Sequence, residues 1–146
     1  MMRGVKLNQR LKDFFDRTLR AKRSPHSIAL GFAIGSFIAI MPTPGFGTLL
    51  GLLVVLLYKK VNKLSVFLGL AFWNPLTLVP LYILSYKIGD MLLAPVPVVD
   101  YDIGVMYAGY HLTRRFLLGN LILSTLLSTV SYAAVRLYVE SQQKKL

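Results

Sequence analysis

Two long uncharged stretches, each interrupted near its middle by proline, constrain this chain more than any other feature. The first covers residues 28–58 and is interrupted at residues 42–47, and the second covers residues 64–86 and is interrupted at Asn74-Pro75. A bilayer core is about 30 Å thick and a helix rises about 1.5 Å per residue, so residues 48–58 and 64–73 each reach only about halfway across. We therefore expect both breaks near the bilayer midplane. Paired broken segments of this kind mark binding or conduction sites in membrane proteins.

The composition predicts lipid as the solvent of this chain. Hydrophobic residues make up 55% of the 146 residues, and the 16% that are charged lie almost wholly outside the apolar stretches. The mean hydropathy is +0.57. A soluble domain of this size has too little interior to bury such segments. We expect one multi-pass integral protein of the cell inner (cytoplasmic) membrane.

The basic residues flank the apolar stretches, and the formal net charge is +11. Short loops rich in Lys and Arg stay cytoplasmic, so we expect these residues to contact anionic membrane lipids, and we expect no nucleic-acid partner. Residues 1–23 have the spacing of a basic amphipathic helix, which would lie on the membrane or dock on protein. The expected membrane-surface residues are Arg10, Arg17, Arg20, Arg23, Lys59, Lys60 and Lys63.

The predicted fold is an all-α integral membrane protein with four parts. Residues 1–23 form an interfacial helix, and residues 24–93 form a membrane domain with two Pro/Gly-broken segments. Residues 94–115 form an extended, interfacial connector because Pro95 and Pro97 favour extended backbone. Residues 116–146 form a C-terminal transmembrane helix and a basic tail. The first broken segment is either a re-entrant hairpin or one long kinked span, and the second is a Pro-broken span.

Small residues recur every four positions in the first stretch, at Gly31, Gly35 and Ala39, and Gly51 repeats the spacing after the break. Such a stripe lets helix backbones approach closely in lipid. We expect these four residues to pack helices together, either within one subunit or at a dimer seam.

The two breaks share one sequence form, a capping residue followed by proline, at Thr43-Pro44 and at Asn74-Pro75. Two half-helix N-termini at one depth would attract an anion such as a phosphate or carboxylate group. The alternative is that the prolines only bend helices in a small bundle. The candidate ligand-binding residues are Thr43, Pro44, Gly45, Gly47, Thr48, Trp73, Asn74, Pro75 and Thr77.

Catalytic chemistry has little support in the sequence. The chain has no cysteine, and the apolar stretches contain no acidic residue. The sequence contains no paired carboxylates, metal-ligand spacing or nucleophile–base pair. We expect no enzyme activity, catalytic residue, metal or cofactor.

Ser24-Pro25 is a capping residue followed by proline and predicts the start of a helix. Several motifs occur in one order: Ser24-Pro25, the paired glycines Gly31 and Gly35, Pro42 followed by Gly45, and Asn74-Pro75 followed by Thr77. Over residues 24–93 this pattern resembles the prokaryotic membrane domain of unknown function twenty sixty-two. Some relatives in that family are joined to glycosyltransferase domains, so the resemblance implies work near lipid-linked sugars or the cell envelope.

Two functions fit these observations. The first is a transporter, channel or lipid-handling protein with a midplane site formed by the two broken helices. Its favoured ligand is an anion or a phosphate-bearing lipid, although the helix carbonyl ends near Met41 and Phe72 would suit a cation. A chain this short would need a homo-oligomer or a partner protein to enclose a path. The alternative is a membrane anchor or scaffold that recruits a cell-envelope enzyme and transports nothing.

Overall fold

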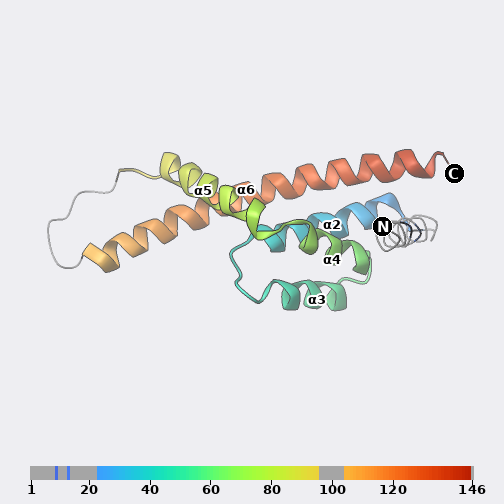
Figure 1. The fold of residues 1–146 in the computed structure, drawn as a ribbon, viewed down its shortest axis with the longest axis horizontal. Helices are drawn as coiled ribbons and strands as arrows, with labels where there is room; N and C mark the ends of the chain where they lie inside the picture. Colours follow the sequence, from blue (N-terminus) through green and yellow to red (C-terminus); the bar gives the residue numbers. More distant parts are fainter. Residues whose placement is uncertain (1–8, 10–12, 14–22, 96–103, 146) are drawn as a thin grey trace, which may run out of the picture.

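The computed structural model describes residues 9, 13, 23–95 and 104–145. It places five helices in this part of the chain: α2 (Pro25–Ile40), α3 (Gly47–Leu57), α4 (Lys63–Phe72), α5 (Pro75–Leu92) and α6 (Gly104–Gln143) (Figure 1). The described residues contain no strand, so the predicted all-helical class is confirmed. The helix predicted for residues 1–23 lies almost wholly outside the described residues, and so do Arg10, Arg17 and Arg20.

Two of the helices begin at the cap–proline pairs that the sequence predicted. The Ser24 Oγ accepts a hydrogen bond from the Ser27 backbone N–H at 3.2 Å, and Pro25 is the first helical residue of α2. Asn74 Oδ1 accepts from the Thr77 N–H at 3.0 Å at the start of α5. A third cap, at Asn62, was not predicted: its side chain accepts from the Leu64 N–H at 3.0 Å and begins α4.

The first broken segment is a hairpin rather than one kinked span. The Ser27 hydroxyl donates to the Lys60 carbonyl at 2.6 Å, and the Asn62 N–H donates to the Ser27 carbonyl at 3.3 Å. The chain therefore leaves along α2, turns at residues 41–46 and returns along α3 to the end from which it started (Figure 1). Gly45 has φ +78°, which a residue with a side chain rarely adopts.

The helices α2 and α4 lie side by side and parallel, with almost no side chain between their backbones. A Cβ on Gly31 would lie 2.7 Å from the Asn62 carbonyl oxygen, and a Cβ on Gly35 would collide with the Val66 carbonyl. From α4, a Cβ on Gly69 would collide with the Phe32 carbonyl. The contacts of Gly31 and Gly35 therefore lie within one chain. Gly51 of α3 faces the Leu70 side chain of α4.

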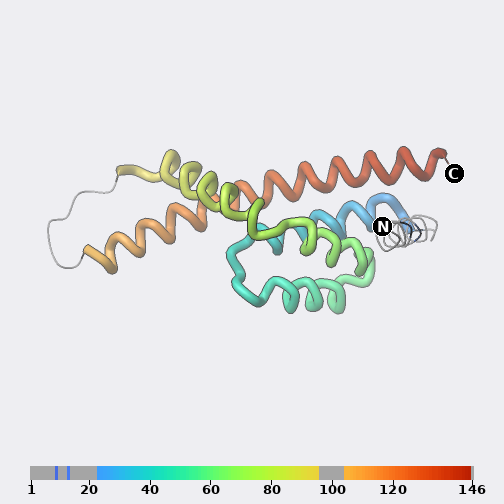
Figure 2. The backbone as a smooth tube through the Cα atoms, viewed as in Figure 1, coloured from blue at the N-terminus to red at the C-terminus, as the bar shows by residue number. Residues whose placement is uncertain are grey.

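The helix α6 runs along the whole molecule and packs against α5 at one end and α2 at the other (Figure 2). Gly119 of α6 contacts the Ser85 backbone of α5, and Gly89 of α5 contacts the Arg115 backbone. Arg115 is buried; it pairs with Asp90 and donates to the Ala94 carbonyl at 2.8 Å.

The prediction of an extended connector over residues 94–115 is wrong from residue 104 onward, because α6 already begins at Gly104. The sequence has no proline after Pro97, so nothing in residues 104–115 stops the helix from extending back from the apolar stretch. Among the described residues, α6 is the one helix long and apolar enough to cross a membrane by itself. The α4–α5 pair also passes that test, with a bend of 76° at its break.

Candidate functional site

The first break does not form the helix start predicted at Thr43-Pro44. Thr43 instead opens a turn, in which its carbonyl accepts from the Phe46 N–H at 3.2 Å, and α3 begins only at Gly47. Phe46 occupies the cap position and makes no side-chain cap bond. The physical reason is the reversal of direction between α2 and α3, which uses Pro44 and Gly45 as turn residues.

The second break has the predicted geometry, but its side chains are already engaged locally. Asn74 caps α5, and the Thr77 hydroxyl donates to the Asn74 carbonyl at 2.9 Å. Asn74, Pro75 and Thr77 are exposed, as are Pro44, Gly45 and Thr48 of the first break. Trp73 is half-buried, and its Nε1 is buried without a hydrogen-bond partner among the described residues. Of the two predicted cap–proline helix starts, the structure has the one at Asn74-Pro75, while α3 begins at Gly47 without a side-chain cap.

Both breaks lie at the same end of the parallel α2–α4 pair, beside a residue of α6 that the sequence analysis missed. Asn120, which is 1% exposed, donates from Nδ2 to the Ile40 carbonyl at 3.1 Å and to the Ser85 hydroxyl at 3.4 Å. It therefore binds the open end of α2 and links α2 to α5. The sequence signal that could have identified Asn120 is that it is the one asparagine in the uncharged stretch of residues 116–135.

The breaks are not centred between the charged ends of the apolar part of α6. At 1.5 Å per residue, Asn120 lies about 8 Å along the helix from Arg115 and about 24 Å from Arg136. Along α6 the breaks therefore lie nearer to Arg115 than to Arg136, and their depth in a bilayer stays a prediction.

From Asn120 to Arg136, every fourth residue of α6 is polar, and three of these residues, Asn120, Ser128 and Tyr132, bond α2. The Ser128 hydroxyl donates to the Ala33 carbonyl at 2.8 Å, and this contact and the Asn120–Ile40 contact set an antiparallel register. In that register Ser124 falls opposite Ser36, and both are fully buried. Thr125 and Thr129 are exposed and bond carbonyls of their own helix.

The most strongly charged feature of the described chain lies at the opposite end of α2 from the breaks. It is an open pocket of about 470 Å³, which we call the basic pocket. It lies among the N-terminus of α2, the loop after α3 and the N-terminus of α4. Its lining includes four cationic residues, Arg23, Lys59, Lys60 and Lys63, together with Ser24, His26 and Ser27.

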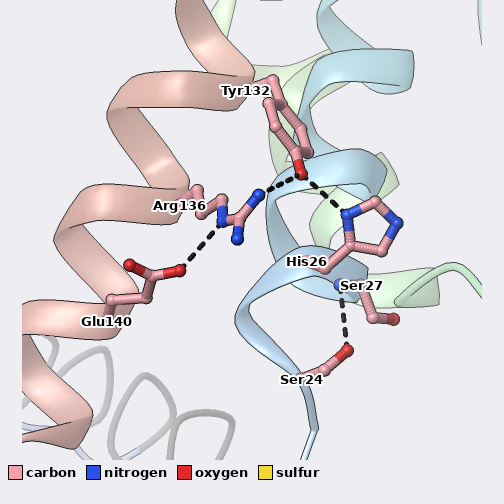
Figure 3. Close-up of polar contacts among 6 residues, drawn as sticks. All are labelled: Ser24, His26, Ser27, Tyr132, Arg136 and Glu140. Carbon is pink, nitrogen blue, oxygen red and sulfur yellow. Dashed lines mark hydrogen bonds and ion pairs between the residues drawn. The ribbon is translucent and has the colours of Figure 1, made fainter.

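A polar network from α6 holds His26 at the rim of this pocket (Figure 3). His26 Nδ1 lies 2.7 Å from the Tyr132 hydroxyl, and Arg136 Nη1 donates to the same hydroxyl oxygen at 3.2 Å. Arg136 Nε in turn donates to Glu140 at 2.9 Å. The hydrogen bonds to Glu140 and Tyr132 raise the pKa of Arg136, so it remains a cation.

Comparison with known proteins agrees with the resemblance seen in the motifs. Residues 8–146 match the model of a family described as "Uncharacterized protein conserved in bacteria (DUF2062)". The chain belongs to this family. The match extends past the motifs at residues 24–93, so the basic pocket and Asn120 of this DUF2062 protein both lie within it. No curated protein matches the chain, and no solved structure matches it.

Proposed function

We propose that this DUF2062 protein is an integral protein of the bacterial inner membrane that binds the phosphate-bearing headgroup of an anionic lipid. The observation that carries the proposal is the basic pocket, in which four cationic residues gather at the edge of an apolar helical bundle. We place lipid handling at this pocket ahead of channel activity at the breaks, because α3 begins at Gly47 without the side-chain cap that the sequence predicted at Thr43.

Membrane insertion is supported by the apolar side chains that the bundle leaves exposed. Along α3 these include Leu52, Leu53, Leu56 and Leu57, the last of them 73% exposed. Exposed leucines in such a row are costly in water and favourable in lipid. The α6 helix is also long and apolar enough to span a membrane.

The position of the pocket supports a lipid ligand in particular. Lys59 and Lys60 follow directly after the last turn of α3, so cationic groups stand next to exposed leucines. A lipid headgroup could then bind in the pocket while its acyl chains lie along α3. Because Lys- and Arg-rich loops stay inside, the pocket would face the cytoplasmic leaflet.

Native mass spectrometry tests the proposal directly. The protein is released from mild detergent in the presence of equal amounts of phosphatidylglycerol and phosphatidylcholine, and the bound lipids are counted. We expect phosphatidylglycerol to be retained preferentially. The double variant Lys60→Gln with Lys63→Gln should lose this preference.

The matched control removes two positive charges elsewhere, by Lys87→Gln with Arg114→Gln, and should keep the preference. Both of these residues are exposed and neither lines the basic pocket. Equal retention of the two lipids by the unmodified protein would refute the proposed function.

A further inference from the structure

The positive charge of the basic pocket has no acidic partner in the sequence around it. Residues 23–89 contain no Asp or Glu, so α2, α3, α4 and the loops between them carry only cationic charge. Glu140 lies on α6, which packs against α2, and it is engaged by Arg136 at 2.9 Å. Asp90 pairs with Arg115 of α6, beyond the breaks and at the far end of α2 from the pocket. Among the residues that the structure describes, no carboxylate lines the pocket. Four cations gathered in this way repel one another, and an external anion would relieve that repulsion.

Backbone groups add to this positive potential, because α2 and α4 are parallel and both begin at the pocket. The first N–H groups of a helix have no partner within it, and the aligned peptide dipoles place partial positive charge there. The side-chain caps satisfy one N–H in each helix, those of Ser27 and Leu64. The helix starts thus add two further sources of positive potential to the four side chains.

His26 supplies a directional donor at the same rim. The Tyr132 hydroxyl oxygen already accepts from Arg136, which leaves the hydroxyl proton to donate to His26 Nδ1. We assign the neutral ring a proton on Nε2, which Figure 3 shows on the side away from Tyr132. His26 also lines the pocket, so this N–H is available to a bound oxyanion.

From these three features we infer that the basic pocket selects a terminal phosphate, a phosphomonoester, over a phosphodiester, and that the phosphomonoester is carried by a lipid. The inference rests on the proposed function and specifies its ligand. A phosphomonoester carries a charge of about −1.5 to −2 at pH 7 and presents three acceptor oxygens. A diester carries a single charge, and its second ester group blocks one of those oxygens.

The experiment compares two lipids that differ only in that blocked oxygen. Phosphatidic acid is the monoester, and phosphatidylmethanol of the same acyl chains is a diester with one added methyl group. Native mass spectrometry of the full chain with equal amounts of both, and of phosphatidylcholine as the reference, should show at least a tenfold preference for phosphatidic acid over phosphatidylmethanol. Lys60→Gln with Lys63→Gln should reduce this preference to near parity, while Lys87→Gln with Arg114→Gln should preserve it.

Soluble inorganic phosphate and pyrophosphate form a second arm, because they share the chemistry without the lipid. Neither anion at millimolar concentration should displace phosphatidic acid. Displacement by either anion would show that the pocket binds a soluble phosphate rather than a lipid. If both lipids are retained equally but above phosphatidylcholine, the monoester selectivity is wrong and the proposed function stands. If retention of neither lipid responds to the pocket variant, both inferences are wrong.

Discussion

At the scale of single residues, Asn120 of α6 is a buried polar side chain that bonds both α2 and α5. It reaches two other helices at once, and it occupies the position where α2 stops and leaves the Ile40 carbonyl without a helical partner. The prolines in the sequence predict the break after α2, but they do not predict that Asn120 bonds the Ile40 carbonyl. The pairing depends on how α6 packs, and no local pattern in the sequence encodes that packing.

We expect Asn120→Leu to lower the free energy of unfolding by about 1 kcal/mol. A buried acceptor left unpaired costs about 1–3 kcal/mol in water-soluble proteins, but hydrogen bonds inside membrane bundles average about 0.6 kcal/mol. Reversible unfolding in mixed micelles measures the change. Thr125→Leu is the matched control: it removes an exposed hydroxyl bonded to its own helix and should be nearly neutral. Equal losses for the two variants would show that Asn120 has no special role.

At the scale of helices, close glycine contacts set how α5 and α6 cross. A Cβ on Gly119 would collide with the Ser85 carbonyl, which is backbone and cannot rotate away. We therefore expect Gly119→Ala to destabilise the protein by about 2–3 kcal/mol through overpacking. Gly109→Ala lies on the same helix with nothing within 4 Å of its Cβ, so helix propensity alone should make it neutral or stabilising. Thermal unfolding in detergent compares the pair, and a harmless Gly119→Ala would contradict this packing.

The two breaks should respond differently to matched substitutions. Asn74→Ala removes a cap with a 3.0 Å bond and should cost about 1 kcal/mol. Thr43→Ala removes only a weak 3.5 Å contact to the Met41 carbonyl and should cost much less. The same unfolding assay measures both variants. Similar costs would restore the symmetric interpretation of the breaks that the sequence suggested.

The helices predicted correctly are those whose signals are local. Ser24-Pro25 and Asn74-Pro75 each place a cap beside a proline, and the chain nearby has no competing demand. Thr43-Pro44 has the same form, a capping residue followed by proline. The chain must reverse direction there between α2 and α3, and this tertiary geometry overrides the local preference. The basic residues at 23, 59, 60 and 63 were predicted as a membrane surface. That they share one pocket follows from the return of the hairpin, which periodicity alone did not decide.

At the scale of the whole molecule, a single chain leaves the non-helical turn between α2 and α3 exposed on its surface. Pro44, Gly45 and Phe46 at the first break are exposed, with Phe46 at 63%. If the bundle lies in lipid, non-helical backbone at that depth must be covered by protein or water. We therefore expect a homo-oligomer in which a second copy covers this turn. Native mass spectrometry in mild detergent should show a defined multiple of the 16.4 kDa chain, whereas a monomer with full lipid binding would contradict this expectation.

The bond between Asn120 and Ile40 also imposes an order on biosynthesis. Its two residues are 80 positions apart, and Asn120 is the later of them to leave the ribosome. At about 5–20 residues per second, the Ile40 carbonyl waits about 4–16 s before its partner is made. During that interval the Ile40 carbonyl must accept hydrogen bonds from water, lipid headgroups or an insertion factor. The nascent chain is therefore most vulnerable to proteolysis and misassembly before α6 is translated.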